Sequence, residues 1–283
     1  MSPEVTLAAI TGFRLVTAAP DRLAAFYRAI GFEVGDATAI PTEEMAVLQL
    51  RGGGVRRTMT LGPSRVDLDV FDSRGRDYPS DTSACDQVFQ HLALVTDDAT
   101  AAWRRASEAG ATSISRTDPI RLPNSAGGVT AIKFRDPEGH PLEFLQFPVG
   151  AKADWSGAGI MGIDHSAICV LDVGASQRFY ASQGLRAGDR SLNHGPTQAA
   201  LDGLDDVVVD VVPMTPSKRP PHVELLGYRH PPPGAGGALC ANDIAATRIV
   251  WRADREDLLR DPDGHLHQLT RSDRSPADTG LRQ

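Results

Sequence analysis

The stretch TGFRLVTAAPDRLAAFYRAIGFEVG, residues 11–35, decides the fold because its pattern returns further along the chain. Its first residues favour a short strand, and the apolar residues after them, including Phe26 and Tyr27, recur at helical spacing. Pro20 stands where the first turn of a helix tolerates proline, and Gly31 stands where a helix ends. The segment therefore predicts a strand followed by an amphipathic helix whose two aromatic residues pack in the core.

Two later segments repeat this design. The segment DHSAICVLDVGASQRFYASQGLRA, residues 164–187, carries the aromatic pair again as Phe179 and Tyr180. The segment QHLALVTDDATAAWRRASEAGA, residues 90–111, contains an aspartate pair that can cap a helix and reaches Gly110 as a helix stop. Repetition of this kind indicates a fold assembled from similar units.

Strand-like sequence follows each predicted helix, and two of these stretches end in the same signature. DPEGHPLEFLQF occupies residues 136–147, and DPDGHLHQL occupies residues 261–269. Asp-Pro-x-Gly favours a tight turn, and an apolar strand follows it in both copies. The repeating unit is thus a strand, a helix and about three further strands, a βαβββ module.

Four such modules span the chain, over residues 8–72, 87–148, 160–214 and 220–271. The fourth is degenerate, because RHPPPGAGGALCAND stands where its helix should follow, and clustered prolines and glycines break helices. We expect an α+β fold in which the modules pair into two incomplete mixed-sheet barrels, in an order that the sequence leaves open. The predicted domains are residues 1–148 and 160–271, with a linker at 149–159 and a flexible tail at 272–283.

Composition narrows the classes of function. The 283 residues are 41% hydrophobic and 23% charged, which is a globular balance. The net charge of −7 is spread over both halves of the chain without a basic face, so nucleic acid is not an expected partner. No apolar run reaches the ~18–20 residues of a membrane helix, and residues 1–13 lack the charged start of a signal peptide. The three cysteines show no CxxC spacing, so we expect a cytoplasmic protein without a disulfide scaffold. We also expect a bacterial protein.

These features together resemble the vicinal oxygen chelate superfamily. The modules, the FYRAIGF helix at 26–32 and the DPxGxxxE closing segment at 136–143 carry the resemblance, which extends over nearly the whole chain. That group includes glyoxalase I, bleomycin-resistance proteins, fosfomycin-resistance enzymes and extradiol ring-cleaving dioxygenases. The resemblance implies a cupped barrel that holds a small molecule. It also implies metal ligands from the first strand of a module, His or Gln, and from its last strand, usually Glu.

Transferred to the N-terminal pair of modules, this pattern leaves one ligand position empty. The first strand of module one offers Gly12, which has no side chain, whereas module two offers His91 and, on its closing strand, Glu143. Asp67, which shares a strand face with Asp69, is the candidate carboxylate of module one. His91, Glu143 and Asp67 form an alternate metal site, in which Glu143 can also act as a base.

The C-terminal pair of modules offers the lead site. The opening strands of modules three and four carry His165 and His222, and the closing strand of module four carries Gln268 seven residues after Asp261. Asp210 is the candidate carboxylate of module three. Two imidazoles and a carboxylate suit a divalent metal such as Zn, Fe, Ni, Co or Mn. Such a centre can polarise a substrate oxygen while Asp210 removes a proton next to a carbonyl.

Three functions are compatible with this pattern. The first is a divalent-metal-dependent, glyoxalase-like lyase or isomerase acting on a small oxygenated molecule. The second is an extradiol-type dioxygenase, although Gln268 replaces a glutamate of those enzymes, and Leu258 and Lys133 stand where they carry a tyrosine before the turn. The third is a metal-free protein that sequesters a small molecule, as antibiotic-resistance proteins do, which agrees with Gly12 and Gln268. In each case the partner is a small molecule, and we expect a monomer or a homodimer.

Overall fold

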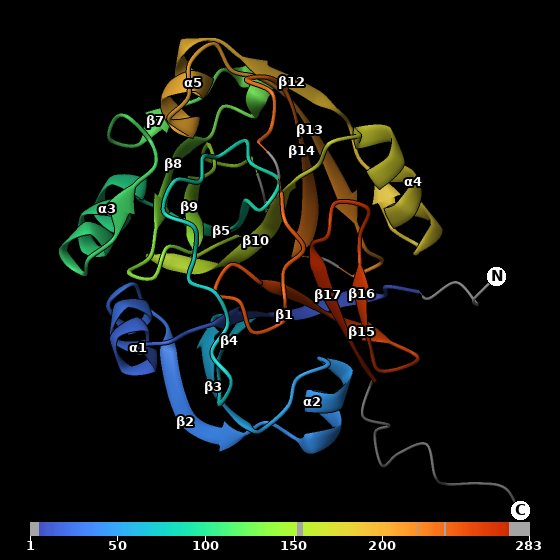
Figure 1. Cartoon of the computed structure of the whole chain (residues 1–283). Coiled ribbons are helices and arrows are strands. Elements are labelled where there is room, and N and C mark those ends of the chain that lie inside the picture. The colour runs from blue at the N-terminus through green and yellow to red at the C-terminus, as the bar shows by residue number, and fades with distance from the viewer. Residues whose placement is uncertain (1–5, 152–154, 219, 235, 272–283) are drawn as a thin grey trace, which may run out of the picture.

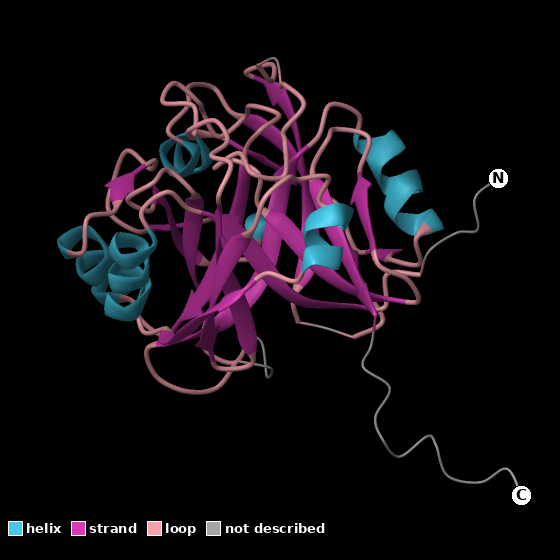
Figure 2. Cartoon of the chain, turned by 60° about the horizontal axis from the view of Figure 1, so that its bottom comes forward, coloured by secondary structure: helices cyan, strands magenta, loops and turns pink. Residues whose placement is uncertain are grey.

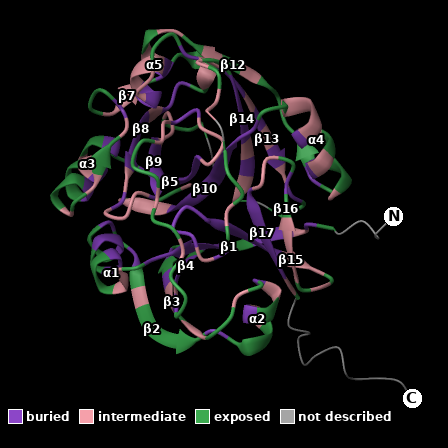
Figure 3. Cartoon of the chain, in the orientation of Figure 1, coloured by how far each residue is buried: buried purple, intermediate pink, exposed green. Residues whose placement is uncertain are grey.

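Two curled β-sheets form the framework of the protein: a seven-stranded sheet, called sheet A, and a ten-stranded sheet, called sheet B. The structure is a computed structural model that describes residues 6–151, 155–218, 220–234 and 236–271. Sheet A lies in the lower half of Figure 1 and sheet B in the upper half, with helices at the periphery (Figures 1 and 2). The buried residues follow the strands at the centre (Figure 3). The predicted α+β class with open, barrel-like sheets is confirmed.

Module one supplies four strands of sheet A. It contains β1 (Ala9–Val16), α1 (Pro20–Ala29), β2 (Glu33–Ala39), α2 (Thr42–Val47), β3 (Gly54–Leu61) and β4 (Ser64–Phe71). Helix α1 begins at Pro20 as predicted, and Gly31, which follows its end, has a φ of +101° that a residue without Cβ adopts easily. Phe26 and Tyr27 are buried. The opening strand β1 pairs in parallel with the closing strand β4.

Modules two and three build sheet B on the same plan. Module two contains β5 (Gln90–Thr96), α3 (Ala99–Glu108), β6 (Thr112–Ser113), β7 (Ile120–Arg121), η1 (Asn124–Ala126), β8 (Thr130–Arg135) and β9 (Pro141–Gln146). Module three contains β10 (Ile160–Cys169), α4 (Val173–Ser182), β11 (Arg186–Ala187), β12 (Ser191–His194), α5 (Pro196–Asp202), β13 (Val208–Thr215) and β14 (His222–His230). Asp98 and Asp172 cap α3 and α4 by accepting backbone N–H groups of the first turn. The opening and closing strands again pair in parallel.

Module four is reduced to three strands. These are β15 (Arg248–Ala253), β16 (Asp257–Arg260) and β17 (Leu266–Arg271), and β15 pairs in parallel with β17. Between β14 and β17 the described residues contain no helix, as the prolines of this segment led us to expect. In the part of the chain that the structure describes, no helix has the length and apolar character needed to cross a membrane.

The boundary between modules three and four differs from the predicted one. Strand β14 closes module three instead of opening module four, because it pairs antiparallel with β13 and in parallel with β10. The alternation of apolar residues predicts a strand at this place but does not say to which module it belongs. Module three therefore extends to residue 230, and module four begins at residue 248. The predicted tail at 272–283 lies outside the described residues.

The modules do not pair in chain order. Strand β1 pairs antiparallel with β15, and β5 pairs antiparallel with β10, so module one joins module four and module two joins module three. The segment 149–159 therefore does not separate the two sheets, since residues 1–148 contribute strands to both. This finding corrects the predicted domains. Each opening strand offers a free edge of similar apolar character, and its local sequence does not specify which other opening strand pairs with it.

The two Asp-Pro-x-Gly turns connect the sheets to each other. Tyr27 of α1 donates a hydrogen bond to Asp136 in the turn of module two at 3.2 Å, and His140 of this turn bonds the last carbonyl of β1 at 3.0 Å. The turn of module four repeats the arrangement, with Tyr180 donating to Asp261 at 2.8 Å. Because each turn belongs to one sheet and its partner to the other, the turns hold the sheets in a fixed relation.

Candidate metal centre

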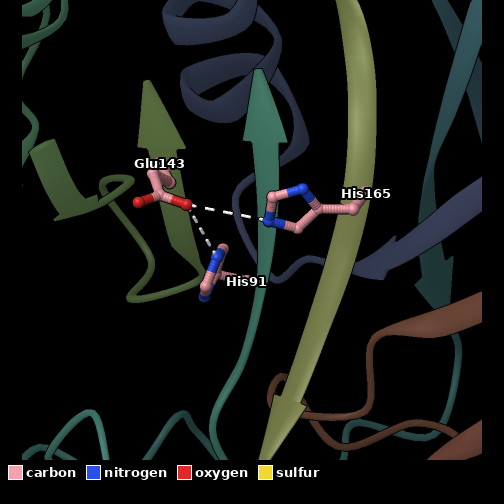
Figure 4. Close-up of side chains that lie close together, drawn as sticks. All are labelled: His91, Glu143 and His165. Atoms are coloured by element: carbon pink, nitrogen blue, oxygen red, sulfur yellow. Dashed lines mark hydrogen bonds and ion pairs between the residues drawn. The ribbon is translucent and has the colours of Figure 1, made fainter. Parts of the chain in front are cut away.

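Two histidines and a glutamate converge on the inner face of sheet B. His91 of β5 and His165 of β10 lie on neighbouring antiparallel strands, and Glu143 lies on β9, the other neighbour of β5. All three residues are buried. Figure 4 shows both imidazole rings turned toward the carboxylate of Glu143. Three strands from two modules thus bring one cluster together.

The donor atoms of this cluster are spaced like ligands around one ion. His91 Nε2 lies 3.0 Å from Glu143 Oε2, and His165 Nε2 lies 3.8 Å from the same oxygen. On the other side, His165 Nε2 lies 3.5 Å from Oε2 of Glu224, which is on β14. Ligands bonded tetrahedrally to zinc at about 2.0–2.2 Å lie roughly 3.3–3.6 Å from one another. The three side chains of the cluster, together with Glu224 beside His165, therefore offer a donor set that fits a divalent cation.

The strand register places these four residues at equivalent positions of two modules. In module two, Glu143 lies opposite the residue that is two positions after His91. In module three, Glu224 lies opposite the residue that is two positions after His165. Each module therefore contributes one histidine from its opening strand and one glutamate from its closing strand. The pairing of β5 with β10 brings the two pairs together.

Hydrogen bonds determine which ring nitrogens face the cluster. The Nδ1 atom of His165 lies 3.1 Å from Asp164 Oδ2, so its N–H group donates to this carboxylate and Nε2 is directed toward the two glutamates. A carboxylate that holds one nitrogen of an imidazole leaves the other available to a metal. His91 Nδ1 is buried and has no hydrogen-bond partner among the described residues, so Nε2 is its only engaged nitrogen.

Opposite charges compensate one another in the cluster. Burial lowers the pKa of His165, but the negative charges of Glu224 and Asp164 outweigh it and raise the pKa to about 9. Burial raises the pKa of Glu224, but the positive charge of His165 outweighs it and the pKa falls to about 2. Burial also opposes ionisation of Glu143, but the hydrogen bond from His91 brings its pKa below the ordinary value. At neutral pH the cluster therefore holds ionised carboxylates and one proton that a cation would displace.

The cluster lines a cavity of about 260 Å³ inside the half-barrel of sheet B. Apolar side chains form much of its wall: Leu122, Val129, Leu145, Phe147, Leu201, Val209, Val211 and Leu226. Lys133 also lines the cavity, next to Glu143 on the neighbouring strand, and its ammonium group donates to Asp202 at 2.6 Å. Burial lowers the pKa of Lys133, but the charges of Asp202 and Glu143 outweigh it, so the side chain is cationic. The cavity suits a compact, largely apolar molecule.

Sheet A presents the same four positions with different side chains. The strand register identifies them as Gly12, Asp67, Arg248 and Gln268. Arg248 is fully buried and donates to Asp69 at 2.7 Å. A guanidinium group offers only N–H donors and cannot ligate a cation. Since Gly12 and Arg248 supply no ligand atom, these four positions do not fit a metal.

The structure redistributes the predicted ligands between the two sheets. His165, from the predicted lead site, joins His91 and Glu143, from the predicted alternate site. Asp67 and Gln268 lie in sheet A, where each is hydrogen-bonded to side chains of module one and is not brought to this cluster. Their positions differ from the predicted ones because module one pairs with module four and module two pairs with module three.

Asp210 also stays away from the cluster. It lies on β13, where it accepts hydrogen bonds from Arg190 at 2.8 Å and Arg229 at 2.7 Å. Its neighbours Val209 and Val211 line the cavity, and successive side chains of a strand point to opposite faces. The carboxylate of Asp210 therefore points away from the cavity, contrary to its predicted role as ligand and base.

His222 borders the cluster, and Glu224, two residues later, is the candidate ligand that sequence reasoning missed. The ring of His222 lies 5.3 Å from that of His165, centroid to centroid, and its Nε2 lies 3.4 Å from Glu224 Oε1. A signal was present, because Val-Glu-Leu-Leu at 223–226 repeats the Leu-Glu-Phe-Leu of 142–145. Interpreting this strand as an opening strand placed a histidine at the ligand position instead of a glutamate.

Comparison with known families finds a match in the first half of the chain. Residues 9–144 match the family model of the Glyoxalase/Bleomycin resistance protein/Dioxygenase superfamily. This segment, which contains most of modules one and two, is therefore a domain of that superfamily. No curated protein matches the sequence.

Solved structures of this type share the fold of nearly the whole chain. Glyoxalase I from Zea mays is 14% identical, with a TM-score of 0.58 over 93% of this chain and 92% of that chain. A candidate dioxygenase from Bacillus subtilis subsp. subtilis str. 168 is 12% identical, with a TM-score of 0.58 over 93% of this chain and 85% of that chain. At such identities the similarity concerns the fold and not the activity.

Proposed function

We propose that this protein is a divalent-metal-dependent enzyme of the glyoxalase type, a lyase or isomerase that acts on a small oxygenated molecule. The observation that carries the proposal is the convergence of His91, Glu143, His165 and Glu224 on one cavity. Charged groups are costly to bury unless they are paired or bind a cation. Three buried donors within 4.8 Å of one another, with the partly exposed Glu224 beside His165, are an arrangement that suits a metal.

The metal would be held by Nε2 of both histidines and by carboxylate oxygens of both glutamates. This mixture of nitrogen and oxygen donors suits Zn, Ni, Co, Mn or ferrous iron. When bound, the ion polarises adjacent oxygens of a substrate and makes the neighbouring C–H group more acidic. Asp164 keeps His165 in the orientation that this role needs, because it accepts the hydrogen bond from Nδ1.

Glu224 is the proposed base in place of Asp210. Its side chain is 22% exposed, against 8% for Glu143, so a molecule in the cavity reaches Glu224 more easily. Its Oε2 faces His165, which leaves Oε1 to accept a proton from a carbon next to a carbonyl. His222 lies 3.4 Å from Oε1 and can stabilise the carboxylate by donating a hydrogen bond.

A ring-cleaving dioxygenase is the second candidate, favoured by one observation. His91, His165 and one glutamate make up the two-histidine, one-carboxylate set of non-haem iron oxygenases. Gln268 no longer counts against this function, because it lies in sheet A. Lys133 still occupies the place where the resemblance calls for a tyrosine, so this function ranks second.

Calorimetric titration of the apoprotein with Zn²⁺, Ni²⁺, Co²⁺ and Mn²⁺ tests the metal centre. We expect one site per chain with a dissociation constant far below the millimolar range. His91→Ala and Glu143→Gln each remove a ligand, and we expect each to weaken binding by at least ~100-fold. His194→Ala is the control, because this histidine is exposed and outside the cavity wall. Millimolar binding to the unaltered protein, or unchanged binding in His91→Ala, would refute the centre.

Two activity assays separate the candidates. Metal-loaded protein is supplied with thiol adducts of 2-oxoaldehydes, and thioester formation is followed by absorbance. Protein loaded with ferrous iron is supplied with catechols, and oxygen consumption is followed. Isomerisation without oxygen uptake supports the first proposal, and oxygen uptake with ring cleavage supports the second. A ligand-dependent rise in Tm that EDTA does not alter would instead indicate sequestration without a metal.

A further inference from the structure

Helix α5 closes one side of the cavity. It belongs to module three but also packs against strands of module two. It packs against β7 and β8 of module two as well as β12 of its own module (Figure 1). The hydroxyl of Ser115 donates to the carbonyl of Leu201 at 2.7 Å, and the backbone N–H of Arg116 donates to the carbonyl of Ala200 at 2.9 Å. These bonds hold α5, and the side chains it carries, in a defined position over the cavity.

Asp202, the last residue of α5, is a fully occupied acceptor. Its Oδ1 accepts from Lys133 Nζ at 2.6 Å, and its Oδ2 accepts from Gln198 Nε2 at 2.9 Å and from the Tyr228 hydroxyl at 3.0 Å. A carboxylate can only accept, so the amide of Gln198 must direct its NH₂ group toward Asp202. This requirement settles the orientation of the Gln198 amide.

The same orientation leaves the amide oxygen of Gln198 without a donor. Gln198 is 5% exposed and lines the cavity, and its Oε1 is buried with no hydrogen-bond partner among the described residues. Asn193 of β12 lines the same cavity, and its Oδ1 is likewise buried and unpartnered within the described chain. Leaving buried acceptors unpaired is unfavourable. Each oxygen belongs to a side chain of the cavity wall and lacks a donor, which an O–H or N–H group of a bound molecule would supply.

This side of the cavity has no free positive charge for an anion. Lys133 is neutralised by Asp202, and none of the described residues that line the cavity is an arginine. Asp189, which also lines the cavity, adds a negative charge. A carboxylate or phosphate placed here would lose its hydration without gaining an ion pair.

We propose that Gln198 and Asn193 determine specificity by selecting a substrate that carries an uncharged hydrogen-bond donor, a hydroxyl or N–H group, distal to the oxygens held at the metal centre. The body of this substrate is apolar, because apolar side chains such as Val129 and Val209 also line the cavity. The inference rests on the proposed function, since the metal centre must hold the other end of the molecule.

Three catechols with a common chelating head test this selection. They are 4-propylcatechol with an apolar tail, 4-(2-hydroxyethyl)catechol with a hydroxylated tail and 3,4-dihydroxyphenylacetate with an anionic tail. Affinity for the zinc-loaded protein is measured by calorimetry. We expect the hydroxylated probe to bind about 5–10-fold more tightly than the propyl probe, as one additional hydrogen bond allows, and the anionic probe to bind most weakly.

Variants assign the preference to the two amides. Gln198→Met keeps the length of the side chain but removes the amide oxygen, together with the NH₂ group that donates to Asp202, so we expect the ratio of the affinities for the hydroxylated and propyl probes to fall to about one. Gln177→Met, on the outer helix α4, is the matched control and should retain the preference. Asn193→Ala is the second variant, should Gln198→Met not fold, and should reduce the preference by about two- to threefold.

The outcomes separate this inference from the proposed function. Zinc binding is measured before any probe is added, and its absence overturns the proposed function. If zinc binds, three results overturn the inference: equal affinity for the three tails, tighter binding of the anionic tail, or a hydroxyl preference that survives in Gln198→Met. Failure of the zinc-loaded protein to bind any of the three catechols overturns it as well, because the cavity would then not accept a chelating head and a distal donor together.

Discussion

A single register position carries His91 and His165 in sheet B but Gly12 and Arg248 in sheet A. The backbone around this position is the same kind of parallel strand pair in every module. An imidazole offers a lone pair to a cation, whereas a guanidinium group offers only N–H donors. The side chain at one position therefore decides whether a half-barrel can bind a metal or is filled by ion pairs.

The proton on His165 makes metal binding dependent on pH. Since the pKa of His165 is raised to about 9 and a ligating nitrogen must be deprotonated, we expect zinc binding at pH 7 to release about one proton. The apparent affinity should rise about tenfold per pH unit below pH 9. In the apoprotein, the protonated ring stabilises the fold below pH 6.5, and this contribution is lost as pH rises toward 9. Calorimetry in buffers of different ionisation enthalpy measures the proton, and heats that do not depend on the buffer would contradict the expectation.

Asp164 acts on the centre through His165. In Asp164→Asn the amide no longer reliably accepts the hydrogen bond from His165 Nδ1, and we expect zinc affinity to fall by about 10–100-fold. Asp189→Asn removes the same charge from another residue of the cavity wall, and the zinc affinity of this variant should change far less. Competition with a chromophoric chelator measures both variants. An equal loss in the two would show that charge alone is responsible, and would contradict a positioning role.

At the scale of the elements, helix α2 supplies a carboxylate that compensates buried positive charges in sheet A. Its Glu44 is placed between Arg14 and Arg56, whose side chains are each 8% exposed, and it also accepts a hydrogen bond from Gln268 at 2.9 Å. Burial raises the pKa of Glu44, but the hydrogen bond from Arg56 and the charge of Arg14 lower it to about 2. Its stabilising contribution is therefore complete above pH 4.5 and is lost only as pH falls toward 2.

Removal of this carboxylate should destabilise the fold and spare the metal centre. Glu44→Ala leaves two buried guanidinium groups without their shared partner. We expect the free energy of unfolding to fall by roughly 3 kcal/mol. This value is at the low end for buried ion pairs because Glu44 is partly exposed. Glu43→Ala, its exposed neighbour, should change stability by less than about 0.5 kcal/mol. Urea unfolding measures both. A zinc affinity that fell in Glu44→Ala would show that the two half-barrels are not independent.

Local sequence was sufficient to predict most of these elements but not their assignment to modules. The start of α1 at Pro20 and the two Asp-Pro-x-Gly turns were predictable because they depend on a few adjacent residues. Strand β14 was predictable as a strand from its alternating apolar residues. Whether it opens or closes a module depends on its pairing with β10, which is distant in sequence. That ambiguity is why His222 was favoured over Glu224.

In the whole molecule, the proposed metal centre depends on strands from both halves of the chain. His91 and Glu143 come from residues 1–148, and His165 and Glu224 come from residues 160–271. The pairing that unites them is antiparallel contact between two opening strands, and all four opening strands have similar apolar sequences. The correct pairing depends on tertiary contacts such as the bond from Tyr27 to Asp136, which no local pattern reveals. For this reason the donor types could be predicted, but their grouping could not.

Interleaved sheets imply that the chain cannot be divided at the predicted linker into two independent domains. We expect fragments 1–148 and 155–283, expressed alone, not to unfold cooperatively, because β1 would lack β15 and β5 would lack β10. Expressed together, they should associate and recover zinc binding, since each supplies one histidine and one glutamate. Affinity capture through a tag on one fragment, followed by calorimetry, measures this. A fragment that unfolded cooperatively and bound zinc alone would contradict the pairing, whereas His91→Ala in the first fragment should abolish zinc binding without preventing association.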